Sequence, residues 1–127
     1  MKAALLAAFC FGAVIATPRF AEAHFVSGNR LYEWCTADRA DELYWVKEGQ
    51  CTAFILGTID AMEAHESVRL AMGEQPLGAA CLPARATAGQ LRDVVVQHIR
   101  NDPKDRHENA AGSVLLALIL AYPCDQS

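Results

Sequence analysis

The chain has 127 residues, of which 53% are hydrophobic and 20% charged, with 11 Lys and Arg against 15 Asp and Glu. A net charge of −4 gives it no electrostatic attraction to nucleic acid or to an anionic membrane surface. Mild acidity suits a basic protein partner, and it is also common in proteins that bind nothing. The sequence has no internal repeat or low-complexity tract, so we expect one domain with a modest core.

The first 23 residues have the layout of a secretory signal peptide. Lys2 precedes an apolar run, Ala3–Ala16, that is too short to span a bilayer, and Ala21-Glu22-Ala23 fits a cleavage site of small residues. We therefore predict a signal peptide over residues 1–23 and a mature domain over residues 24–127. The mature domain keeps nine basic and fourteen acidic residues, a net charge of −5, and is expected in an oxidising compartment.

The mature chain is predicted to begin with a short and a long helix. Ser27 is placed to cap a short helix that ends near Cys35. A long helix is expected from about Tyr44 to Leu70, where apolar residues recur at helical spacing. Gly57 lies inside it and costs ~1 kcal/mol relative to alanine, which is typical of a site of close helix packing.

Two further helices are expected after a loop. Residues 72–86 contain two glycines and two prolines, which favours irregular structure. Thr87 and Gln90 have the spacing of a capping box and open a third helix, which Asp102-Pro103 ends. The last helix, about Glu108 to Ala121, is apolar on every side, so it is either fully buried or also meets a second subunit.

The four cysteines of the mature chain predict two disulfides. Cys35, Cys51, Cys81 and Cys124 allow three pairings, and the nested order of the helices favours Cys35 with Cys51 and Cys81 with Cys124. Each bond should stabilise the fold by about 3–4 kcal/mol. A redox or metal role would suit a Cys-x-x-Cys motif, which the chain lacks. We therefore predict an all-α, compact bundle of about four main helices stapled by two disulfides.

The sequence offers no set of residues that suits an enzyme. His65 and Glu66 begin like a zinc-protease helix, but Arg69 stands where the second histidine would be. Asp60, Glu63 and Glu66 could share a helix face, which is usually a solvated stripe rather than a metal site. No nucleophile, base and oxyanion-binding group fall together. We expect no catalytic residue, no metal and no cofactor.

Several short motifs of the mature chain, taken in order, are similar to those of a known protein family. They are Ser27-Gly28-Asn29-x-Leu31-x-x-x-Cys35, Cys51-x-x-Phe54-Ile55-x-Gly57-x-x-Asp60-Ala61, Cys81-Leu82-Pro83, Thr87-x-Gly89-Gln90-Leu91-x-Asp93-Val94-Val95, Asp102-Pro103-x-x-Arg106-His107, Ala117-Leu118 and Tyr122-Pro123-Cys124. This order resembles the type VI secretion amidase immunity (Tai-like) family of small periplasmic proteins. The chain departs from the usual pattern at Ala53, where glycine is common, and at Phe54, where tyrosine is usual.

The resemblance implies a function. Members of that family are helical, contain disulfides, are often dimeric and bind a secreted cell-wall amidase whose cleft holds a cysteine–histidine pair. The resemblance therefore implies a periplasmic immunity protein that occludes the amidase cleft. It also implies that the protein can form a homodimer. Two alternatives remain: a stress- or chaperone-like helical protein of the periplasm, and an envelope structural or assembly factor without a toxin partner.

Two loops are the candidates for partner contact. One is the loop after the long helix, and the other is the turn before the last helix. An ordinary solvent-exposed loop is the alternative for both. The candidate residues are Arg69, Glu74, Gln75, Lys104, Arg106 and His107.

Overall fold

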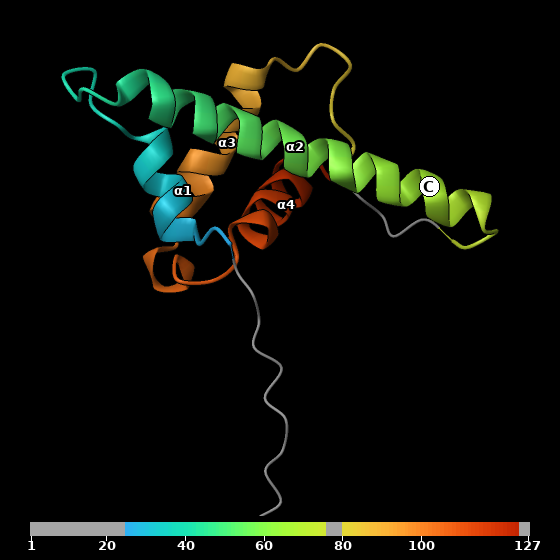
Figure 1. Ribbon diagram of the computed structural model, residues 1–127. Coiled ribbons are helices and arrows are strands. Elements are labelled where there is room, and N and C mark those ends of the chain that lie inside the picture. The colour runs from blue at the N-terminus through green and yellow to red at the C-terminus, as the bar shows by residue number, and fades with distance from the viewer. Residues whose placement is uncertain (1–24, 76–79, 125–127) are drawn as a thin grey trace, which may run out of the picture.

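A computed structural model describes residues 25–75 and 80–124, and the regular elements of these two ranges are helical. They are α1 (Gly28–Cys35), α2 (Tyr44–Ala71), α3 (Ala88–Asn101), the 3-10 turn η1 (Pro103–Asp105) and α4 (Ala110–Ala121) (Figure 1). The predicted all-α bundle is confirmed. The predicted signal peptide lies outside the described residues. Within the described ranges, no helix is both long enough and apolar enough to cross a membrane.

Side-chain caps set where the helices begin. The Ser27 hydroxyl accepts a hydrogen bond from the Arg30 amide, and Thr87 and Gln90 form the predicted capping box. The last helix begins at Ala110, two residues later than predicted, because Asn109 is its N-cap and accepts from the Ala111 amide at 2.9 Å. Local sequence therefore sets three of the helix starts.

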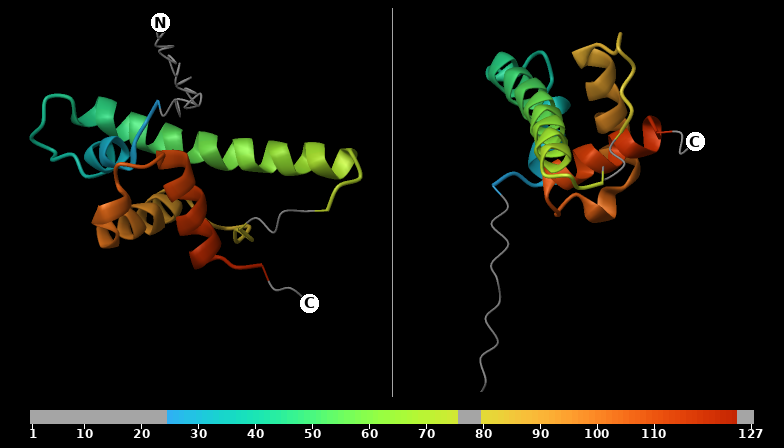
Figure 2. Two further views of the ribbon diagram at one scale, coloured as in Figure 1. Left: turned by 90° about the horizontal axis from the view of Figure 1, so that it is seen from below. Right: turned by 90° about the vertical axis from the view of Figure 1, so that its right-hand side faces the viewer.

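The core forms where α2 crosses the other three α-helices (Figures 1 and 2). On α2 and α3 the buried residues repeat every four positions, and on α1 they are spaced by three and four positions, so each of these helices presents one narrow row to the core. The buried apolar residues are Leu31, Cys35, Cys51, Ile55, Ile59, Leu91, Val95, Ile99, Ala110, Val114, Ala117 and Leu118.

The last helix is only half buried. Val114 and Leu118 are fully buried, whereas Leu116, Ile119 and Leu120 are 48%, 40% and 65% exposed. The first of the two alternatives for this helix, full burial, is therefore wrong. An all-apolar sequence does not show which side of a helix its neighbours will cover.

Both predicted disulfides are present. Cys35–Cys51 joins α1 to α2 within the core, and Cys81–Cys124 ties the segment before α3 to the end of the chain after α4. The second link is reinforced by a hydrogen bond of 2.9 Å from the Cys81 amide to the Tyr122 carbonyl. Disulfides are typical of proteins that fold in an oxidising compartment.

The long helix α2 is anchored along only half of its length. Its buried residues are Cys51, Ile55 and Ile59, and none of residues 60–71 is buried. We call residues 60–71 the overhang, because this end of the helix projects beyond the other helices (Figure 1). Gly57 was predicted to mark close helix packing, but a Cβ placed there would meet no atom within 4 Å.

Candidate protein-interaction surfaces

The loop after α2 gathers three of the candidate residues at the tip of the overhang. Arg69 Nη1 lies 2.8 Å from Glu74 Oε2, and Arg69 Nη2 donates to the Gln75 carbonyl at 2.9 Å. Gly73 takes a positive φ of 76°, which lets the chain reverse at the end of the helix. The Arg69 guanidinium therefore holds this turn together.

The second candidate loop is the turn of residues 102–108. Lys104 Nζ lies 3.0 Å from Asp105 Oδ2 and 3.3 Å from Asp102 Oδ1, and its side chain is 76% exposed. The hydrogen bond to Asp105 and the second carboxylate raise the pKa of Lys104, and the same lysine lowers the pKa of Asp105. His107 is 69% exposed, with Nδ1 2.9 Å from the Lys104 carbonyl oxygen. Charged and exposed side chains thus crowd this turn.

Arg106 anchors the turn instead of pointing out of it. Its Nε donates to the Ile99 carbonyl at 2.8 Å and its Nη2 to the Arg100 carbonyl at 3.0 Å, so it caps the end of α3. Its guanidinium carbon lies 4.1 Å from the centre of the Tyr32 ring on α1, a cation–π contact. The structure therefore gives this candidate contact residue a scaffold role.

The backbone of the turn also packs tightly against the start of α1. The Asn29 amide donates to the Arg106 carbonyl at 2.6 Å, and the Gly28 amide donates to the Glu108 carbonyl at 2.9 Å. A Cβ on Gly28 would lie 2.9 Å from the Arg106 carbonyl oxygen. The glycine is therefore required for this close approach.

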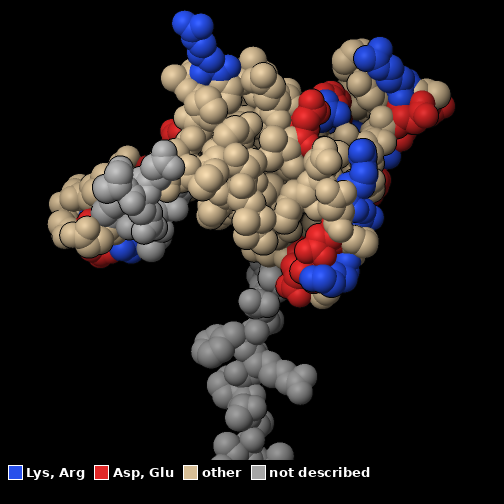
Figure 3. Space-filling model, turned by 180° about the vertical axis from the view of Figure 1, so that it is seen from behind, with Lys and Arg blue, Asp and Glu red and all other residues tan. Residues whose placement is uncertain are grey.

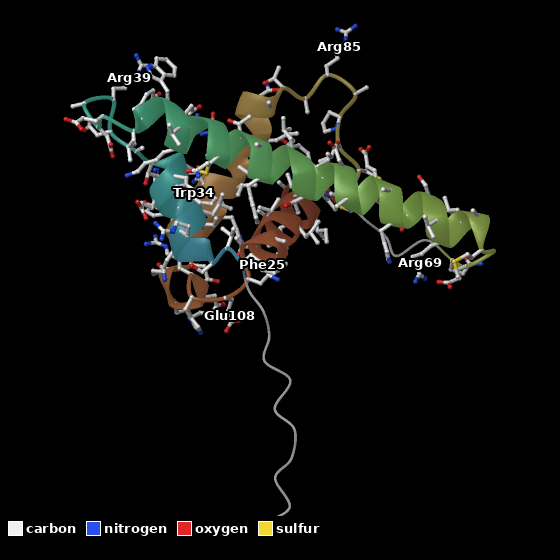
Figure 4. All side chains as sticks on the ribbon, in the orientation of Figure 1. Phe25, Trp34, Arg39, Arg69, Arg85 and Glu108 are labelled. Atoms are coloured by element: carbon white, nitrogen blue, oxygen red, sulfur yellow. A yellow bond between two sulfur atoms is a disulfide. The ribbon has the colours of Figure 1, made fainter. Side chains whose placement is uncertain are left out.

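The two candidate loops lie at opposite ends of the molecule. Figure 4 labels Arg69 on the overhang and Glu108 at the end of the turn, with the body of the bundle between them. Seen from the side away from α2, the middle of the surface is mostly uncharged, and charged side chains gather at the end that carries α1 and η1 (Figure 3). The turn belongs to the charged end of the molecule.

An apolar groove runs between α2 and α4. It has a volume of about 750 Å³, and Gly57 and Ala61 of α2 and Leu115 and Ile119 of α4 are among its lining residues. This groove was not predicted from the sequence. Ala53, Gly57 and Ala61, spaced four residues apart, were its only local signal, because the groove forms only once α4 packs against α2.

The three carboxylates of α2 do not gather with other ligand side chains in the described part of the chain. Asp60 and Glu63 are exposed, Glu66 is partly buried at the groove, and His65 lines the groove beside it. Across residues 25–75 and 80–124, no three His, Cys, Asp or Glu side chains are arranged to hold a metal ion.

Comparison with known proteins assigns the family. The family model of the Rap1a immunity proteins matches residues 27–124, which include all four α-helices and both disulfides. No curated protein and no solved structure gives a significant match. Immunity proteins neutralise a toxin, so the family implies a toxin as the partner. The chain belongs to the family of Rap1a immunity proteins.

Proposed function

We propose that this protein neutralises a secreted peptidoglycan amidase in the periplasm by occluding its active-site cleft. The match to the Rap1a immunity family over residues 27–124 is the observation that carries the proposal. The amidase as target rests on the resemblance of the sequence motifs to the type VI secretion amidase immunity (Tai-like) family. Occlusion requires a rigid and complementary surface and no chemistry from the inhibitor.

The turn of residues 102–108 is the part of the surface that best suits entry into a cleft. It presents Lys104 and His107 on a backbone that Arg106 and the start of α1 hold in place. A loop that is already ordered loses little conformational entropy when it binds, so more of its contact energy appears as affinity. We therefore propose that Lys104 and His107 contact the amidase and that Arg106 positions them.

The tip of the overhang is the alternative contact. Glu74 is 43% exposed there, but the Arg69 guanidinium is already bound to Glu74 and to Gln75. Because the tip and the turn lie at opposite ends of the molecule (Figure 4), one cleft should engage only one of them. Paired variants at the two ends can therefore identify the contact.

A co-expression assay tests the function and the contact together. The full chain is expressed with a candidate secreted cysteine–histidine amidase, sought first among the products of neighbouring genes, and survival of the host is measured. We expect the chain to restore growth, and removal of residues 1–23 to abolish protection. Lys104→Glu with His107→Ala should lower protection at least tenfold, whereas Glu74→Lys should leave it unchanged. The reverse ranking would move the contact to the tip, and no rescue by the unaltered chain would reject the function.

We also propose that the protein forms a homodimer. The support is the exposed apolar surface, which includes Leu116 and Leu120 of α4 and Val46 and Val68 of α2. Exposed apolar groups gathered on helices commonly mark protein–protein contacts. Sedimentation of the purified secreted chain at several concentrations tests this proposal: a mass of one chain at all concentrations would reject it.

A further inference from the structure

The outer face of α2 is apolar where an isolated helix would be polar. A helix that buries one face normally carries charged residues on the opposite face, since that face meets water. Six exposed residues of α2, spaced by three, four or seven positions, instead form one uncharged row along its outer side. We call this row the outer stripe: Val46, Ala53, Gly57, Ala61, Ala64 and Val68.

The outer stripe faces away from the core. Counting ~100° per residue, Gly57 lies about 160° around the helix from the buried Ile55 and Ile59. Val46 and Val68 are 55% and 56% exposed. Within the described residues, nothing in the single chain covers the stripe, and its small members leave the helix backbone open to close approach.

The glycine at the centre of the stripe is not needed by the single chain. A Cβ at residue 57 would meet no atom within 4 Å, and the backbone there is helical. Alanine would stabilise the helix by ~1 kcal/mol, so the isolated fold gives no reason for a glycine. Close contact with a second helix does give one, because small residues let two helix backbones approach each other.

The stripe is also symmetric about this glycine. Val46 and Val68 lie eleven residues before and after Gly57, and Ala53 and Ala61 lie four residues before and after it. At seven residues before and after Gly57 the two positions differ, since Gln50 is polar and Ala64 is apolar. Gln50 is therefore the one departure from the symmetry. When two antiparallel copies of a helix cross at a two-fold axis, the residue n positions before the axis on one copy faces the residue n positions after it on the other. An antiparallel pair of α2 helices crossing at Gly57 therefore places valine on valine and alanine on alanine.

We propose that the outer stripe binds the outer stripe of a second copy of this chain, with the two α2 helices antiparallel and the two-fold axis at Gly57. The inference rests on the proposed homodimer and assigns its surface. Three members of the stripe, Ala53, Gly57 and Ala61, also line the groove between α2 and α4. The contact is therefore continuous with the groove, and the apolar walls of the groove add to the buried area. The stripe itself carries no charge, so two acidic chains meet there with little repulsion.

Cysteine cross-linking tests the position of the axis. At an interaxial distance of ~8–10 Å, facing Cα atoms lie about 3.4–5.4 Å from each other, and the upper part of this range is one that a disulfide bridges. Oxidised Gly57→Cys protein should run mainly as a covalent dimer on a non-reducing gel. Gly49→Cys is the matched control, since Gly49 is also an exposed glycine of α2 with open space around it but lies off the stripe. It should cross-link at least tenfold less.

A charge variant provides the second test. Ala61→Glu places two carboxylates at the close crossing, and the dissociation constant of the dimer, measured by sedimentation, should rise at least 100-fold. Gln97→Glu on α3 adds the same charge at an exposed position away from the stripe and should change it less than threefold. Circular dichroism of both variants checks that the helices are intact.

The outcomes separate the interface from the dimer and from the immunity function. A dimer that withstands Ala61→Glu and cross-links no better at residue 57 than at residue 49 would overturn the stripe and leave the homodimer standing. A monomeric wild-type chain would overturn both. A monomer whose amidase binding is lost with Ala61→Glu would assign the stripe to the toxin. The measurements on the purified chain do not involve the amidase, so immunity can succeed or fail independently.

Discussion

The two halves of α2 are held in different ways. Residues 44–59 are fixed by the Cys35–Cys51 disulfide, by the burial of Ile55 and Ile59, and by an ion pair between Glu48 and Arg92 of α3. The overhang, residues 60–71, has no buried side chain. The first half therefore maintains the fold, whereas the second half leaves most of its side chains accessible. Its apolar residues contribute little to the stability of the single chain.

Replacing one leucine of the core and one leucine of the overhang should give the largest difference in stability. Leu118 of α4 is fully buried in the core, and Leu118→Ala should cost about 2–5 kcal/mol of unfolding free energy. Leu70 is 55% exposed on the overhang, and Leu70→Ala should cost no more than about 0.5 kcal/mol. Urea unfolding at a low protein concentration measures both. Similar losses would show that the overhang is packed after all.

Two glycines differ in the space around them, so replacing each with alanine should have opposite effects on stability. Gly28→Ala should destabilise the protein by about 1–3 kcal/mol, because the new methyl group would strike the Arg106 carbonyl. Gly49→Ala is the control, since a Cβ there meets nothing within 4 Å. It should stabilise the protein by up to ~1 kcal/mol through helix propensity. A neutral Gly28→Ala would mean that the turn is not held against α1.

A substitution at the tip of the overhang should loosen the tip without changing the stability of the rest of the fold. Arg69→Met removes the contacts with Glu74 and Gln75 while keeping much of the apolar stem. We expect faster amide hydrogen exchange over the last turn of α2 and a global unfolding free energy within about 0.5 kcal/mol of wild type. A loss of global stability would instead show that the overhang unfolds together with the core.

The smallest expected effect is the contribution of Asp41 to stability, which should be lost in acid. Hydrogen bonds from Lys47 and from the Leu43 amide lower the pKa of Asp41 below its usual 3.8. The unfolded carboxyl therefore takes up its proton at a higher pH than the folded one. Its contribution to stability is complete well above pH 3.8 and is lost as the pH falls through and below that value. Asp41→Asn should make the acid loss of thermal stability shallower, and an unchanged slope would contradict the contact.

Local patterns predicted most of the fold. Ser27 and the Thr87–Gln90 capping box mark helix starts by hydrogen bonds that reach three residues, so their spacing is visible in the sequence. The disulfide pairing followed from the order of the helices. These features depend on neighbours in the chain or on the order of the elements, which the sequence records directly.

The interaction surfaces were harder to predict because they depend on distant contacts. Arg106 reads as a charged residue of an exposed turn, yet it packs on Tyr32, which is far from it in the chain. The outer stripe consists mostly of small residues whose exposure depends on which face of α2 the other helices cover. The half-exposed α4 shows the same limit, since an apolar run does not indicate its uncovered side.

Titration of the amidase is the most direct test of the central claim, neutralisation by occlusion. The candidate amidase of the co-expression assay is purified, its hydrolysis of peptidoglycan is measured, and the secreted and oxidised chain is added in steps. Tight occlusion predicts that activity falls in proportion to the added chain and vanishes near one chain per enzyme. An amidase that keeps its full activity in excess chain would contradict the claim, whatever the oligomeric state of the chain.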